Sequence, residues 1–138
     1  PLQALGLWDG PQFVEASLAL ARLALVAEAQ ESREPTEPSV AELDRRRVAF
    51  LVRSLASRPP TAEETEAMTA LIEAQREAYR LDPDAARRLA NFSLERAAHP
   101  GDEAPEPEPM TDEVAVETAA TTVVASALLG LPDVVQRR

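Results

Sequence analysis

Apolar residues recur at intervals of three and four along most of this chain, a spacing typical of amphipathic helices. The first such segment runs from Pro11 to about Ser32. Its apolar row comprises Val14, Leu18, Ala21 and Leu25, and the row is widened by Phe13, Leu20, Leu23 and Ala24. A helix that is apolar on most sides is buried on most sides. This segment is therefore either central in the domain or covered by another polypeptide surface.

Four further helices are predicted, most of them from a capping residue at the start and a break at the end. Two starts have the spacing of a capping box, in which a hydroxyl and a glutamate three residues later each accept a backbone N–H. The predicted starts are Ser39 with Glu42, Thr61 with Glu64, Asp82 with Pro83, and Thr111 or Asp112. The three longer helices end at about Ser57, Arg80 and Leu129.

The chain is therefore expected to be all-α, an irregular helical bundle of about five main helices with a Pro/Glu-rich loop before the last one. No segment shows a convincing strand alternation, and no internal repeat is present. Residues 1–138 fit a single domain or the C-terminal portion of a larger domain, with flexible linkers near 31–38 and 99–110. The first and last long helices are expected to pack together as the core, since both are apolar nearly all round.

The composition narrows the choice of partners. A formal net charge of −10 argues against nucleic acid or an anionic membrane surface, because both would repel the chain. Cysteine is absent, which excludes disulfides, thiolate metal sites and covalent haem attachment within this segment. No apolar run reaches the roughly 20 residues that a membrane span needs. We expect no cofactor in this chain.

Few residues are candidates for catalysis. His99 is the only histidine, and it has no partner at the spacing of a metal site. Glu63, Glu64 and Glu66 could form a cation site, but carboxylates in a first helical turn interact well with the helix dipole. We interpret them as capping residues. The sequence predicts no catalytic, cofactor-binding or metal-binding residue, and a part of a hydrolase completed by other domains is the least favoured alternative.

Arginine supplies all fourteen basic residues. The run Arg45–Arg47 diverges around one helix, so a solvent-facing role is expected, with salt bridges between domains as the alternative. Arg58 follows a helix end and could also reach a carboxylate of the next helix. Exposed i,i+3 ion pairs, each worth a few tenths of a kcal/mol, are expected at Glu73–Arg76 and Glu77–Arg80.

Trp8 is the only tryptophan, and aromatic residues dominate interface hot spots. It is expected either in the core or as an anchor for a partner. The predicted partner interface comprises Trp8, Phe13, Leu20 and Leu23.

Three stretches of the chain, taken in order, resemble one family. They are PLQALGLWDGPQFVEASLALA from Pro1, AFLVRSLASRPPTAEETEAMTALIEAQ from Ala49, and VVASALLGLPDVVQRR from Val123. They are similar to the segments "PLQAL, then D-PQFVEAA", "AFR..LGRPPT..E...L...L" and "VARVLLNLDEFITRE" of the planctomycete-specific C-terminal domain. The family's Asn-Asp is replaced by Trp8-Asp9-Gly10, and its closing Asn by Gly130. Any polar role of those residues would be partly lost here.

The resemblance implies the end of a large exported protein with cytochrome-c-like modules, located in the periplasm or cell envelope. Haem would belong to upstream modules, and the resemblance implies no catalytic residue. Because PLQAL lies inside the family domain and the chain begins without Met, we expect an upstream half of the domain to be missing.

The favoured hypothesis is a non-catalytic helical structural or interaction segment that packs against upstream domains of the same polypeptide. The alternative is a free-standing helical subunit or adaptor of a larger complex.

Overall fold

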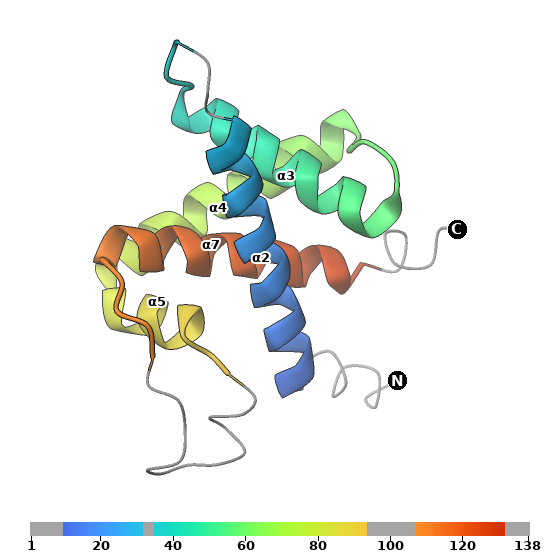
Figure 1. Cartoon of the computed structure of the whole chain (residues 1–138). Helices are drawn as coiled ribbons and strands as arrows, with labels where there is room; N and C mark the ends of the chain where they lie inside the picture. Colours follow the sequence, from blue (N-terminus) through green and yellow to red (C-terminus); the bar gives the residue numbers. More distant parts are fainter. Residues whose placement is uncertain (1–9, 32–34, 94–106, 132–138) are drawn as a thin grey trace.

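Five α-helices dominate the computed structural model, which describes residues 10–31, 35–93 and 107–131 (Figure 1). The helices are α2 (Pro11–Glu31), α3 (Val40–Ala56), α4 (Ala62–Leu81), α5 (Pro83–Ala90) and α7 (Asp112–Leu129). No strand occurs in these three ranges, and the predicted all-α class is confirmed.

Most helices begin at the predicted caps. The Thr61 hydroxyl accepts the N–H of Glu64 at 3.1 Å, and the Glu64 carboxylate accepts the N–H of Thr61 at 2.9 Å, which completes a capping box. Ser39 and Thr111 cap α3 and α7 through their hydroxyls, and Asp82 caps α5 through its carboxylate. Each cap provides a partner for an N–H that has none inside its helix.

The turn between α3 and α4 is fixed by a residue in an unusual conformation and by an ion pair. Ser57 lies in the left-handed region, with φ of 55°, and its N–H donates to the Arg53 carbonyl. Arg58 then donates two hydrogen bonds to the Glu64 carboxylate, at 2.7 and 3.0 Å. The prediction that Arg58 could reach the next helix is confirmed, and this contact joins the end of α3 to the start of α4.

Helix α7 is central, and it packs against α2, α4, α5 and, to a smaller extent, α3. Figure 1 shows α2 crossing α7 on one side while α4 lies on the other. The residues buried on α7 are mostly small or β-branched: Ala115, Val116, Thr118, Ala119, Ala120, Thr121, Thr122, Val124, Ala125 and Leu128. Small side chains let neighbouring helices approach from several directions. The predicted packing of the first and last long helices is confirmed.

Two apolar clusters form the core of the described residues. The larger one joins α2, α3, α4 and α7, and comprises Ala24, Val48, Leu51, Val52, Ile72, Ala120, Val124, Ala125 and Leu128. The smaller one joins α5 to the first half of α7, and comprises Ala86, Ala115, Val116 and Ala119. Because α7 contributes to both, every other helix is placed relative to it.

Candidate interaction surface

Helix α2 has one buried face and one exposed face. Its buried residues are Ser17, Leu18, Ala21 and Ala24, on the side that meets α7 and α3. The opposite side carries an uncharged exposed row, here called the outer face: Gln12, Ala16, Ala19, Leu23, Val26 and Gln30. Leu23 is 57% exposed and Val26 is 54% exposed. Single exposed aliphatic residues are ordinary, whereas Leu23 and Val26 lie one turn apart and form an apolar patch together with Ala16 and Ala19.

The two flanks of the outer face differ. On one side Leu20 and Ala27 are half-buried and extend the apolar surface. On the other side lie Glu15 and Arg22. The Arg22 guanidinium donates to the Ala90 carbonyl at 2.8 Å. This contact directs its positive charge to the C-terminal end of α5, where helix carbonyls carry partial negative charge.

The four residues of the predicted interface have different surroundings. Leu23 lies on the outer face, and Leu20 lies beside it and packs partly against the larger core cluster. Phe13 is half-buried and lines a cavity at the start of α2. Trp8 lies outside the described residues. The structure thus places Leu20 and Leu23 about one turn apart on α2. Phe13 lies on the same flank as Leu20 but two turns nearer the start of the helix, where it lines the cavity.

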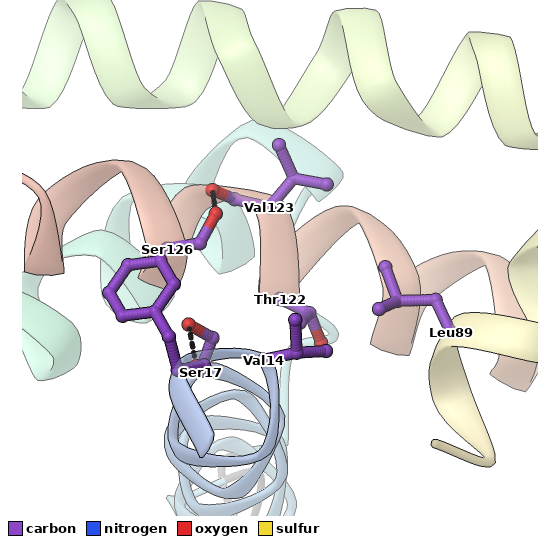
Figure 2. A pocket seen from close by; sticks show the side chains of 7 residues that line it. Val14, Ser17, Leu89, Thr122, Val123 and Ser126 are labelled. Carbon is purple, nitrogen blue, oxygen red and sulfur yellow. Dashed lines mark hydrogen bonds between the residues drawn. The ribbon is translucent and has the colours of Figure 1, made fainter. Parts of the chain in front are cut away.

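The cavity next to Phe13 lies between α2, α5 and α7 and has a volume of about 250 Å³ (Figure 2). Its lining comprises Phe13, Val14, Ser17, Leu89, Thr122, Val123 and Ser126. Each of its three hydroxyls donates to a carbonyl of its own helix, at 2.7 to 2.8 Å. No acid or base is among these lining residues, so none of the hydroxyls has the neighbouring base that would activate it as a nucleophile.

A buried ionic network joins four helices. Arg76 of α4 donates to Asp44 of α3 at 2.6 and 3.1 Å, and to Glu117 of α7 at 2.7 Å. Glu117 also accepts from Arg47 of α3, which makes a two-bond contact with Glu28 of α2. Three carboxylates and two guanidinium groups leave the network one negative charge in excess.

The network favours the charged forms of Glu117, Arg76 and Arg47. Burial disfavours the charge on Glu117, but hydrogen bonds from Arg76 and Arg47 outweigh it and lower the pKa of Glu117. The hydrogen bonds with Asp44 raise the pKa of Arg76. Burial also disfavours the charge on Arg47, yet its contacts with the two glutamates raise its pKa. A general acid or base needs a pKa near the working pH, so these shifts favour a structural role.

The network corrects two interpretations of the sequence. The run Arg45–Arg47 is not uniformly solvent-facing: Arg45 is exposed and Arg46 pairs with Glu42, but the Arg47 side chain is only 7% exposed. Nor is Arg76 part of an exposed pair with Glu73. The guanidinium groups of Arg47 and Arg76 point inward because each binds carboxylates on two other helices.

The other residues considered for catalysis or metal binding either have a structural role or lie outside the described residues. Glu63 and Glu66 are exposed near the start of α4, and Glu64 accepts from Thr61 and Arg58. His99 lies outside the described residues. In the described ranges no group of three histidine, cysteine, aspartate or glutamate side chains could hold a metal ion.

Comparison with family models, curated proteins and solved structures found no match. The resemblance to the planctomycete-specific domain therefore stays a prediction that rests on its three motifs. Among the described helices, none combines the length and the apolar character needed to cross a membrane.

Proposed function

We propose that this chain is a non-catalytic helical module that binds another protein surface through the outer face of α2. The observation behind this proposal is the row of uncharged exposed residues that contains Leu23 and Val26. Each is a large aliphatic side chain more than half exposed, on a helix whose opposite side already supplies the core contacts. Covering these side chains with another apolar surface would be favourable by about 25 cal/mol per Å².

The polar groups support an architectural role. Within the described residues, the most buried charges bind one another across α2, α3, α4 and α7. Among the described residues that line the cavity at Phe13, none is a base that could activate a hydroxyl. These features stabilise a fixed arrangement of helices, which is what a module that presents a binding surface requires.

The resemblance extends this proposal to a particular setting. There the partner would be the upstream domains of the same exported, cytochrome-associated polypeptide, and haem would belong to those modules. In the alternative setting the partner is another subunit of a complex. The intact mass of the native polypeptide, with a haem stain of the same band, separates the two: a mass far above 14.9 kDa supports the first setting.

A photo-crosslinking amino acid placed at position 23 tests the module itself. When this variant is produced in the native source and irradiated, we expect position 23 to cross-link to the partner. Mass spectrometry should map the adducts to one defined peptide of the partner surface. The matched control places the same group at Leu81, which is 83% exposed at the end of α4 and lies outside the outer face. If position 23 gives no more adduct than position 81, the outer face is not a binding surface and the proposal is wrong.

A further inference from the structure

Helix α7 is buried or half-buried along most of its length, and its apolar pattern favours no particular side. From Ala115 to Leu129 no residue is exposed. Most residues in this stretch are alanine, threonine, serine or valine, so the sides of the helix differ little in size and polarity. An amphipathic helix is oriented by its apolar stripe, which α7 lacks. Other contacts therefore have to decide which side of α7 faces which neighbour.

Three hydroxyl groups of α7 do not make this choice. Those of Thr121, Thr122 and Ser126 each donate to a carbonyl of α7 itself, at 2.7 to 2.8 Å. These hydrogen bonds turn with the helix, so they are the same whichever side faces a neighbour. Asp112 pairs with Arg87 of α5, but both side chains are more than a third exposed, and exposed ion pairs contribute little.

Glu117 is the one charged residue between Ala115 and Leu129. Its carboxylate accepts hydrogen bonds from Arg76 of α4, at 2.7 and 3.3 Å, and from Arg47 of α3. Both arginines are buried. Turning α7 by one residue, about 100° around its axis, would carry the carboxylate away from both guanidinium groups. These contacts with two other helices therefore favour one rotational position of α7.

The charges of the network show that Glu117 is not needed to compensate the two arginines. Without Glu117, Arg76 keeps its two hydrogen bonds to Asp44, at 2.6 and 3.1 Å. Arg47 keeps its two-bond contact with Glu28. Two guanidinium groups would then face two carboxylates, whereas with Glu117 the network has one negative charge in excess. This balance points to a role for Glu117 other than neutralising charge.

We propose that Glu117 sets the rotational position of α7 in the bundle, and so selects one packing among several that bury similar apolar surface. In coiled coils, a single buried polar residue fixes the alignment of the helices in this way, at a cost in stability. Here the effect reaches the whole fold, because α7 contributes to both core clusters. The proposal concerns the core rather than the outer face, so it is independent of the proposed function.

The substitution Glu117→Met tests this proposal, because methionine has a similar length but carries no charge and donates no hydrogen bond. The measurement is an amide proton–nitrogen correlation spectrum by NMR, with helical circular dichroism of the same sample. In the wild type each amide of α7 should give one peak. In Glu117→Met the helical signal should stay close to that of the wild type. The amides of α7 should then give two or more peaks each, or broaden through exchange between packings.

The matched control is Thr121→Val, one turn further along α7. Thr121 is fully buried, and its hydroxyl donates within α7, so this variant changes a buried polar group without touching the contacts of Glu117 with α3 and α4. It should give one peak for each amide of α7. A second variant, Glu117→Gln, keeps an amide oxygen that can accept from an arginine, and it should show less doubling than Glu117→Met.

Three results would overturn the proposal. Single, sharp α7 peaks in Glu117→Met with intact helices would show that α7 keeps its position without the carboxylate. Loss of the helical signal in both Glu117 variants would show that the carboxylate is needed for stability instead. Equal doubling in Thr121→Val would show that any change in the buried part of α7 loosens the packing.

Discussion

Substitution of Arg76 by methionine tests whether the buried ionic network stabilises the fold. Methionine replaces most of the aliphatic stem but donates no hydrogen bonds. The Asp44 side chain, only 6% exposed, would lose both hydrogen bonds from Arg76 and keep Arg47 at 3.8 Å. Removing one member of a buried pair typically costs about 3–5 kcal/mol, because the remaining charge is uncompensated. We expect a loss of that size, a large part of the roughly 5–15 kcal/mol that stabilises a typical domain.

Urea unfolding followed by helical circular dichroism measures this loss. For a denaturant slope of about 2 kcal/mol per M, a loss of about 4 kcal/mol lowers the midpoint by about 2 M. The matched control is Arg80→Met, one turn further along α4, where the side chain is 61% exposed and lies 3.8 Å from Glu77. Exposed pairs contribute little, so the control should change stability by less than about 1 kcal/mol. Equal effects of the two substitutions would refute the reasoning.

A double substitution identifies the origin of the loss. Asp44→Leu combined with Arg76→Met removes both charges and fills their place with apolar side chains. Replacing a buried ion pair in this way is often neutral or stabilising. We therefore expect the double variant to be more stable than Arg76→Met alone. If the double variant is less stable than Arg76→Met, the cost of the single substitution does not come from the uncompensated charge of Asp44.

Three further predictions concern the caps, the core and the response to acid. Thr61→Ala should lower the free energy of unfolding by about 1 kcal/mol, measured in urea, because it removes a helix cap. Leu128→Ala should cost about 2–5 kcal/mol in the same assay because Leu128 is fully buried, whereas Leu81→Ala should change little. Hydrogen bonds from Arg58 and Thr61 lower the pKa of Glu64 from 4.5 to about 2, so the folded state binds fewer protons there than the unfolded state. The stability contributed by the charged Glu64 is present above about pH 4.5 and is lost as the pH falls toward about 2. In Glu64→Gln, the urea midpoint should therefore fall less between these two pH values than it does in the wild type. Midpoints that fall equally steeply with acid in both proteins, an unaffected Thr61→Ala, or equal costs of the two leucine substitutions would each contradict the corresponding reasoning.

The helices could be predicted because their signals are local. Pro11, Thr61 and Asp82 fix helix starts through backbone chemistry that needs no distant partner. The helical spacing of Val48, Leu51 and Val52 also places them on one side of α3, and all three are fully buried. Long-range contacts are not required to make either inference.

The different environments of α2 and α7 could not be predicted in the same way. Both helices are apolar nearly all round, so their patterns indicated burial without specifying what covers each side. Only the assembled fold shows that α7 is surrounded by four helices, whereas α2 meets its neighbours mainly on one side. The prediction for α2 offered two alternatives, a central position or coverage by another surface. Within the described residues α2 is not enclosed on all sides, since its outer face is exposed.

The helical spacing of Asp44 and Arg76 indicates that both are buried, but pairing each charge with a neighbour in the sequence hides this. Asp44 lies four residues before Val48, and Arg76 lies four residues after Ile72, so both occupy the buried side of their helices. Interpreting Arg76 by the carboxylate three residues before it led to an exposed pair with Glu73. The period of the helix pointed inward, but the carboxylate of Glu117 that helps to satisfy Arg76 comes from α7, 41 residues away.

Polar contacts of α2 with its neighbours also affect binding through the outer face. Glu28 ties α2 to Arg47 of α3, and Arg22 ties it to the end of α5. Together with the buried row around Ala21, these contacts fix the inner side of α2 and one of its flanks, and within the described residues the outer face stays exposed. A helix fixed before binding loses little conformational entropy when it binds. Burial of Leu23 and Val26 against a partner would therefore be offset less by ordering of the helix, and the loss of rigid-body freedom would be the main remaining cost.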